Sequence, residues 1–226
     1  MGPTLWGSSL STFDGGHAGH LDMLHNSPNG SGIAWAGNNV YWYYDGYHGS
    51  LSRYDFVMDH GLGGTDHSDG IMYRAIEGGL GYEDGVASHV VYNFDNGHVY
   101  AADTANNRII AVDSNTGEIG SVVTPDYDGG TQRRINGIQN WVVADGNSIE
   151  PAMAKPSGME MHDGMLFVSD YATARIYALT LEGEVVDWLD TGFAPNSIMG
   201  ITFDDAGSLY VVDHNTPQVL KISVPG

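Results

Sequence analysis

The sequence predicts an all-β protein of the β-propeller class. The first observation is a pattern of three short strands, clearest over residues 88–113, in which runs of β-branched and aromatic residues are separated by turns such as Asp95-Asn96-Gly97. Such runs, bounded by Asx-Gly turns, predict β-hairpins. The second observation is that the pattern recurs along the chain. One small sheet cannot bury both of its faces, so the copies must stack around an axis, and closing the ring protects their edges.

The middle strand of this pattern has four copies. Each copy has an aromatic residue near its start and an aspartate at its end, and the first copy is one residue longer. A residue that returns in every copy is expected to belong to the architecture, holding a turn to nearby backbone N–H groups, and we assign it no catalytic role. The copies are residues 40–45, 99–103, 166–170 and 209–213, and they end at Asp45, Asp103, Asp170 and Asp213.

The remaining strands follow from the same alignment of copies. First strands are expected to begin at Ser31, Ser88, Ser157 and Met199, third strands over 51–55, 108–113, 175–179 and 219–222, and outer strands over 71–76, 138–144 and 184–188. The sequence therefore predicts a single domain with four recognisable blades, over residues 31–76, 87–144, 156–190 and 197–224, and a strand over 4–10 that completes the last blade. Residues 124–156 lack the repeated signature, which favours an extended strand with a loop over a further blade.

Composition excludes some classes of partner. The chain has 226 residues and a formal net charge of -20, from 28 acidic residues against 8 Lys and Arg. This charge argues against nucleic acid or an anionic membrane as a partner, and it favours cations or an acidic surface that keeps an exported or salt-tolerant protein in solution. Cysteine is absent, so there is no disulfide framework, and no apolar run is long enough to span a membrane. The start of the chain lacks the basic and apolar regions of a signal peptide.

The pattern x-Val/Leu-Tyr-x-x-Asp-x-x-x-x-Arg-Ile, clearest in residues 99–112 and 166–179, resembles the NHL-repeat propellers. The resemblance covers residues 31–224. Residues 19–28, 44–56 and 59–70 are also similar to uncharacterised bacterial proteins of NHL type. That family usually closes its ring with six blades, so the resemblance implies that this chain is the C-terminal part of a six-bladed ring. It also implies that the full-length protein is secreted or periplasmic, and that an incomplete ring would self-associate through its exposed ends.

The strongest cluster of candidate ligands lies within 22 residues of the chain. Imidazole groups suit zinc and copper, while carboxylates suit calcium, so the cluster predicts a divalent metal site without naming the ion. The alternative is a structural loop whose carboxylates bind its own backbone N–H groups. The members of the cluster are His48, Asp59, His60, Asp66, His67 and Asp69.

Two further histidine positions are relevant. His89 begins a first strand, and the chain distantly resembles NHL-type peptidyl-hydroxyglycine amidating lyases, which place zinc-binding histidines at this position in several blades. The matching positions here are Gly32, His89, Gly158 and Gly200, so this chain departs from a three-histidine set. His89 either joins the cluster above at the channel mouth or is a hydrogen-bonded strand residue. The pair His17-x-x-His20 has a spacing that permits chelation, but a glycine-rich loop must lose entropy to order it.

Three functions are compatible with these features. The first is an exported module that binds a metal ion or small ligand at the channel mouth. The second is a metal-dependent lyase or lactonase-like hydrolase, in which Tyr44, Tyr47 or Arg53 would contact the ligand and supply acid or base. The third is a scaffold for protein interactions. We expect a small molecule, metal or protein as the partner, and neither nucleic acid nor membrane insertion.

Overall fold

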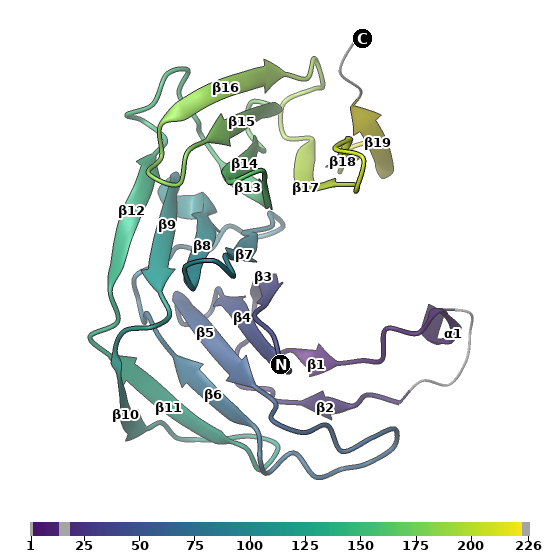
Figure 1. The fold of residues 1–226 in the computed structure, drawn as a ribbon, viewed down its shortest axis with the longest axis vertical. Coiled ribbons are helices and arrows are strands. Elements are labelled where there is room, and N and C mark those ends of the chain that lie inside the picture. The colour runs from purple at the N-terminus through teal and green to yellow at the C-terminus, as the bar shows by residue number, and fades with distance from the viewer. Residues whose placement is uncertain (1, 14–18, 223–226) are drawn as a thin grey trace. The chain divides into compact units, whose positions relative to one another are not determined.

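The structure is a computed structural model that describes residues 2–13 and 19–222. The chain divides into two compact units, the first made of residues 1–79 and 116–138 and the second of residues 80–115 and 139–226. Regular structure in the described residues is almost entirely β-strand, numbered β1 to β19, with a four-residue helix α1 (Leu10–Phe13) and a short 3-10 turn at Thr104–Asn106 (Figure 1). The predicted all-β class is therefore confirmed. No helix among these residues has the length and apolar character needed to cross a membrane.

The first unit is built on a six-stranded sheet with the order β10-β11-β6-β5-β4-β3. Strands β3 to β6 are antiparallel neighbours in chain order, as the repeated pattern predicts. Their bounds are β3 (Gly30–Trp35), β4 (Val40–Asp45), β5 (Ser50–Asp55) and β6 (Ile71–Arg74), and the sheet is extended by β10 (Glu118–Val122) and β11 (Thr131–Asn136).

The N-terminal strand differs from the prediction. Only Thr4–Leu5 (β1) are extended, and they pair with β2 (Asp22–Met23) inside the first unit, with Thr4 opposite Met23. The repeated pattern predicts residues 4–10 at the edge of the last blade instead. The strand stops early because residues 7–9 are Gly-Ser-Ser, which lack the branched or aromatic side chains that favour extension.

Strand β11 is a second departure from the prediction, because it pairs with β6 in parallel, with Thr131 opposite Ile71. The segment TQRRIN has no apolar alternation to mark it as a regular strand. Polar side chains hold it instead: Arg74 of β6 donates to Gln132 at 2.6 Å, and Arg134 donates to Glu77 at 2.8 Å. Periodicity of apolar residues could not reveal a strand that is attached by charged and amide groups.

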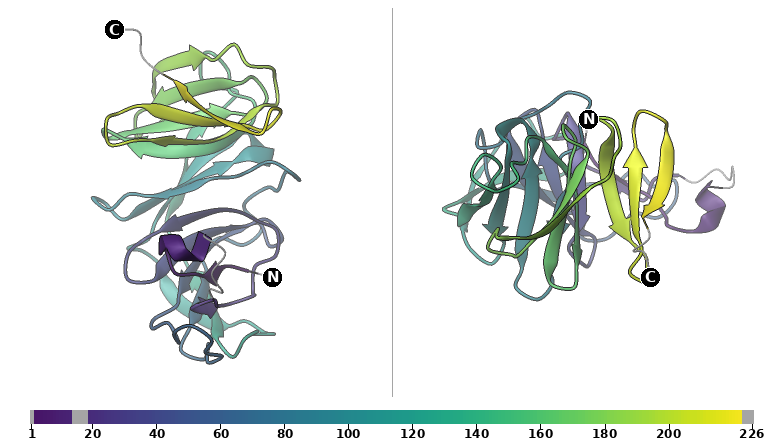
Figure 2. Two further views of the ribbon diagram at one scale, coloured as in Figure 1. Left: turned by 90° about the vertical axis from the view of Figure 1, so that its right-hand side faces the viewer. Right: turned by 90° about the horizontal axis from the view of Figure 1, so that it is seen from above.

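The second unit contains three antiparallel sheets, ordered β12-β9-β8-β7, β13-β14-β15-β16 and β17-β18-β19. In the right-hand view of Figure 2, the two yellow strands β18 and β19 of the last sheet lie side by side. The first strands of the repeats in both units start within two residues of the predicted positions. The bounds are β7 (Val90–Tyr92), β8 (His98–Asp103), β9 (Arg108–Asp113), β12 (Asn140–Asp145), β13 (Pro156–His162), β14 (Met165–Asp170), β15 (Arg175–Leu179), β16 (Val185–Asp190), β17 (Ile198–Phe203), β18 (Leu209–Asp213) and β19 (Gln218–Ile222).

Each unit has its own apolar core. In the first unit Leu24, Tyr54, Phe56 and Met72 form a fully buried cluster. In the second unit a larger cluster joins β8, β9, β14 and β15, with Leu166 and Tyr177 among its fully buried members. Burying side chains of this size contributes about 1.5–3 kcal/mol each. The alternation of these residues along the strands is what the periodic sequence pattern detects.

The aspartates at the ends of the middle strands have the architectural role that their repetition predicts. Asp45, Asp103 and Asp170 are fully buried, and Asp213 is nearly so. Asp170 accepts hydrogen bonds from the backbone N–H of Ala154 at 2.8 Å and of Lys155 at 2.7 Å. It also accepts from the hydroxyl of Thr173 at 2.7 Å. A buried carboxylate is stable only when it is supplied with such donors.

Replacing Asp170 by Asn should destabilise the second unit by about 2–4 kcal/mol, because an amide offers one acceptor oxygen where the carboxylate uses two. Chemical denaturation monitored by intrinsic fluorescence measures this change. The matched control is Asp187→Asn, since Asp187 is exposed on β16 and should change the free energy of unfolding by less than about 0.5 kcal/mol. Equal effects in the two variants would contradict the architectural role.

Candidate metal centre

Three histidines of the first unit meet at one point. One ring nitrogen from each of His20, His60 and His67 lies within 4.8 Å of the other two. The ring centroids of His60 and His67 are 4.7 Å apart, and those of His20 and His60 are 4.9 Å apart. A tetrahedral zinc ion with bonds of 2.0–2.1 Å would bring such nitrogens to about 3.4 Å of one another. Small side-chain rotations therefore separate the observed arrangement from a coordination sphere.

The three rings reach this point from different segments. His20 stands two residues before β2, while His60 and His67 belong to the segment that joins β5 to β6. The backbone N–H of His60 donates to the carbonyl of Leu21 at 3.1 Å, which joins this segment to the strand that follows His20. Glycine is required beside the site, because a Cβ on Gly64 would collide with the His60 ring. This requirement explains part of the glycine content of the segment.

In two of the three rings, a hydrogen bond at the nitrogen that points away from the cluster fixes the tautomer. His67 Nδ1 is 2.9 Å from the carboxylate of Asp22, and both side chains are buried. His60 Nδ1 is 2.6 Å from the carbonyl oxygen of Gly61. A carbonyl and a carboxylate oxygen accept, so Nδ1 donates in both rings and Nε2 of the neutral imidazole carries the lone pair. A carboxylate or carbonyl behind a histidine is the usual support of a metal ligand.

Two of the ring nitrogens in this cluster are buried. Nε2 of His20 and Nε2 of His60 are both buried and have no hydrogen-bond partner among the described residues. A buried polar atom left unpaired costs about 1–3 kcal/mol. A cation bound between the rings would satisfy both atoms at once.

Asp22 is the charged group behind the cluster. Burial raises the pKa of its carboxyl above the ordinary value, while the hydrogen bonds from His67 and from the backbone N–H of Met23 act in the opposite direction. The Asp22 side chain is wholly buried, so water screens the negative charge of its carboxylate little and this charge acts strongly on the imidazole of His67. A metal ion on the far side of that ring would offset this charge.

The three aspartates that the sequence analysis grouped with His60 and His67 bind their own loop instead. All three are exposed. Asp59 accepts from the N–H of Gly61 at 2.9 Å, Asp66 from the hydroxyl of Ser68 at 2.6 Å, and Asp69 from the N–H of Met58 at 3.2 Å. The Ser68 side chain is also the main reason why the pKa of Asp66 is lowered. The carboxylates therefore follow the alternative in which they bind groups of their own loop. The imidazoles of His60 and His67 instead meet that of His20.

His48 and His89 lie outside the group of three histidines. His48 Nδ1 is 2.7 Å from Asp45, and its ring packs edge-on against Tyr47. His89 belongs to the second unit, where its backbone N–H donates to Ser157 at 3.0 Å. Burial lowers the pKa of the His89 side chain, which favours its neutral form.

The three residues predicted to contact a ligand lie in three different environments. Tyr44 is fully buried in β4, and Arg53 donates to Asp55 at 3.1 Å with its guanidinium 5.2 Å from the centroid of the Tyr73 ring. Tyr47 is 67% exposed and lines a pocket of the first unit. Of the three, only Tyr47 is therefore free to meet a ligand.

His20 carries a weaker sequence signal than His60 and His67, and Asp22 is not among the residues predicted from the sequence. The spacing His20-x-Asp22 within a polar segment was the available signal. His17, which was paired with His20, lies outside the described residues. His20 and His60 are 40 positions apart in the chain, so only the folded arrangement shows that they share one site.

No family model and no curated protein match this sequence. Solved structures do match it. A chain in the crystal structure of a nidogen/laminin complex has a TM-score of 0.57 at 16% identity, over 87% of this chain and 61% of that one. An auxiliary nutrient binding protein from Bacteroides ovatus has a TM-score of 0.52 at 16% identity, over 88% of this chain and 49% of that one. A protein from Lactobacillus plantarum gives 0.52 at 10% identity, over 100% and 67%.

At these identities the likeness shows the fold alone. The matched structures have propeller folds, and this chain is built of several small sheets in which all strand pairs but β6 with β11 are antiparallel, so the protein is a β-propeller. The chain spans about 61% and 49% of the length of the first two of these structures.

Acid should weaken the second unit through His89. Its pKa is lowered on folding, so the unfolded chain binds a proton first as the pH falls below about 6.5, and the stability that the neutral ring contributes is lost below that value. His89→Gln should therefore lose less unfolding free energy than the natural protein between pH 7.5 and 5.5, by up to about 1.4 kcal/mol per pH unit within the affected range. Urea unfolding at a series of pH values measures this, with the exposed His214→Gln as control. Identical pH slopes for His89→Gln and the natural protein would show that the buried ring does not carry the effect.

Proposed function

We propose that this β-propeller is an exported, NHL-type binding module that holds a divalent metal ion, preferably zinc, between His20, His60 and His67. The observation that supports this best is the convergence of three ring nitrogens within 4.8 Å, with two buried Nε2 atoms that have no partner among the described residues. Nδ1 of two rings is also directed to a carboxylate and a carbonyl, which is the support that metal-binding histidines usually have.

The donor set favours zinc or copper over calcium. Calcium needs six to eight oxygen ligands, whereas neutral imidazole nitrogen is a preferred ligand of zinc and copper. The nearby carboxylates of Asp59, Asp66 and Asp69 are engaged by backbone or hydroxyl groups of the same loop. Three protein ligands also leave the fourth position of a tetrahedral ion open to a small ligand.

The same open position supports a second candidate function, a metal-dependent lyase or lactonase-like hydrolase. Zinc with three histidine ligands and an exchangeable water is a frequent catalytic arrangement, in which the metal lowers the pKa of that water. We rank this second because Tyr44 is buried and Arg53 is paired with Asp55. The exposed Tyr47 lines a pocket that includes none of the three histidines. Zinc-dependent turnover of a lactone that disappears in His67→Ala would favour the enzyme over the binding module.

The zinc-reconstituted chain should contain about one tightly bound zinc per molecule, measured by inductively coupled plasma mass spectrometry after dialysis. His20→Ala, His60→Ala and His67→Ala should each lose most of it, because two ligands cannot hold the ion against dialysis. Asp22→Asn should keep the site but weaken affinity about 10- to 100-fold, since it removes the charge behind His67. His214 is exposed in the turn that follows β18, so His214→Ala is the matched control and should retain all the zinc. Unchanged zinc content in a His60→Ala/His67→Ala double variant would refute the proposal.

Zinc should also stabilise the folded chain, because the ion joins the segment before β2 to the segment between β5 and β6. At a free zinc concentration of 100 Kd the gain is about 2.7 kcal/mol. Thermal unfolding with zinc and with an excess of chelator measures it. The difference should vanish in His67→Ala and persist in His214→Ala.

A further inference from the structure

The first unit contains a pocket that is built from residues other than the three histidines. Its volume is about 520 Å³, within the range of sites for small molecules. Residues of four segments line it: the chain before β3, the turn after β4, the end of β6, and the loop that precedes β11 together with β11 itself. The lining residues that matter to the argument are His25, Tyr47, His48, Arg74, Tyr127 and Gln132.

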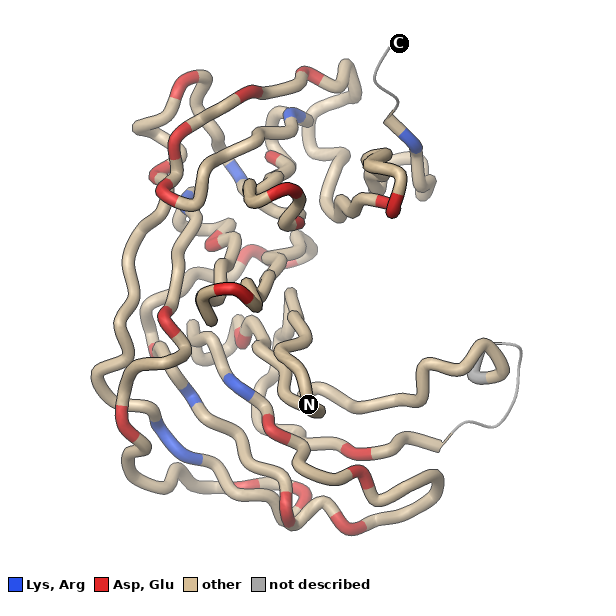
Figure 3. Tube along the Cα trace, viewed as in Figure 1, with Lys and Arg blue, Asp and Glu red and all other residues tan. Residues whose placement is uncertain are grey.

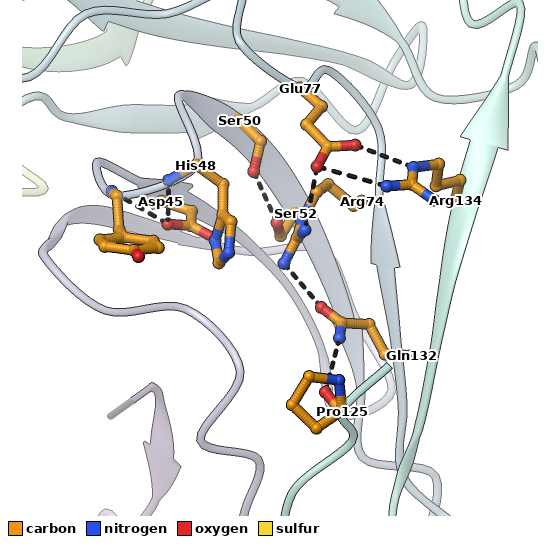
Figure 4. Close-up of polar contacts among 10 residues, drawn as sticks. Asp45, His48, Ser50, Ser52, Arg74, Glu77, Pro125, Gln132 and Arg134 are labelled. Carbon is orange, nitrogen blue, oxygen red and sulfur yellow. Dashed lines mark hydrogen bonds and ion pairs between the residues drawn. The ribbon is translucent and has the colours of Figure 1, made fainter. Parts of the chain in front are cut away.

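A buried cation is held rigidly in the lining. The Arg74 side chain is 3% exposed, and it donates through one terminal nitrogen to Glu77 at 3.2 Å and through the other to Gln132 at 2.6 Å (Figure 4). Gln132 is itself fixed, since its amide donates to the carbonyl of Pro125 at 3.2 Å. Glu77 is shared with Arg134, which donates to it at 2.8 Å. One carboxylate therefore pairs with two guanidinium groups.

Arg74 has hydrogen-bonding capacity to spare. A guanidinium carries five N–H groups, and the partners above take one from each terminal nitrogen. The Nε of Arg74 is buried and has no hydrogen-bond partner among the described residues. An unpaired buried donor is costly, and the acceptor that best satisfies a guanidinium is a carboxylate.

Two histidines of the lining are pre-oriented in the same manner. His25 Nδ1 is 3.1 Å from a carboxylate oxygen of Asp128, and His48 Nδ1 is 2.7 Å from one of Asp45. The carboxylate fixes each ring through Nδ1 and leaves Nε2 as the atom that can meet a ligand. The pocket therefore offers a ligand two oriented imidazole groups in addition to the guanidinium of Arg74.

Two aromatic side chains of the lining remain exposed. Tyr47 is 67% exposed and Tyr127 is 51% exposed. Large exposed aromatic rings around a pocket are suited to pack on the flat face of a ring-shaped ligand. Arg74 is one of only 8 Lys and Arg in the chain, and it lines the same pocket as these two rings.

We propose that this pocket binds a small, ring-bearing organic carboxylate, whose carboxylate meets Arg74 and whose ring packs on Tyr47 and Tyr127. The two histidines would hydrogen-bond to polar substituents of the ring. The site shares none of its lining with the histidines proposed to hold zinc, so each proposal can fail without the other.

Benzoate and glucuronate are the test probes, with benzamide and glucose as neutral counterparts of the same rings. Isothermal titration calorimetry and saturation-transfer difference NMR on the whole chain should show at least one acid binding ten-fold or more tightly than its neutral counterpart. Tyr47→Ala/Tyr127→Ala should weaken that binding at least five-fold, and both side chains are exposed enough to be replaced without loss of the fold. Arg74→Gln should abolish it, with circular dichroism to verify folding.

Arg175→Gln and Tyr82→Ala are matched controls outside the pocket and should bind as the natural protein does. His60→Ala/His67→Ala should also bind the acid normally, which separates this site from the metal centre. Failure of both acids to bind at 10 mM would overturn the proposal. So would equal binding of an acid and its neutral counterpart, or unchanged binding in the double tyrosine variant.

Discussion

Each repeated unit of this propeller depends on a carboxylate that is removed from water and supplied with hydrogen bonds by the turn that follows it. Asp45 accepts from the backbone N–H of Tyr47 and His48, and Asp213 accepts from the N–H of Asn215 and the hydroxyl of Thr216. A buried carboxylate without such donors would be strongly unfavourable, so the turn can adopt few other conformations. The strands on either side are thereby set in register.

Both candidate sites use a carboxylate in a second way, behind a histidine ring. Asp22 supports His67 at 2.9 Å, Asp45 supports His48 at 2.7 Å, and Asp128 supports His25 at 3.1 Å. In each pair Nδ1 is occupied, so the chemistry of the ring is directed to Nε2. Asp45 has both roles, because its carboxylate binds the backbone N–H groups of its own turn and also orients the ring of His48 in the pocket.

The repeated strands could be predicted from the sequence because each carries its own local signal, and β3, β7, β13 and β17 begin within two residues of the expected positions. Strand β11 could not, since charged and amide side chains rather than apolar alternation attach it. His60 and His67 were identified by their spacing. Their third partner, His20, and the pocket around Arg74 arise from contacts between distant segments that no local pattern encodes.

The charge of the whole chain acts on the two sites in opposite directions. With a formal net charge of -20, and acidic residues spread along the trace while basic ones are few (Figure 3), the field of the protein attracts cations and repels anions. A metal ion at the histidines gains from this field, whereas a carboxylate in the pocket must overcome it. Binding of the carboxylate therefore rests on the short-range contacts of Arg74 and the tyrosine rings. Added salt shortens the reach of the field, so it reduces the advantage of the cation and the penalty of the anion together.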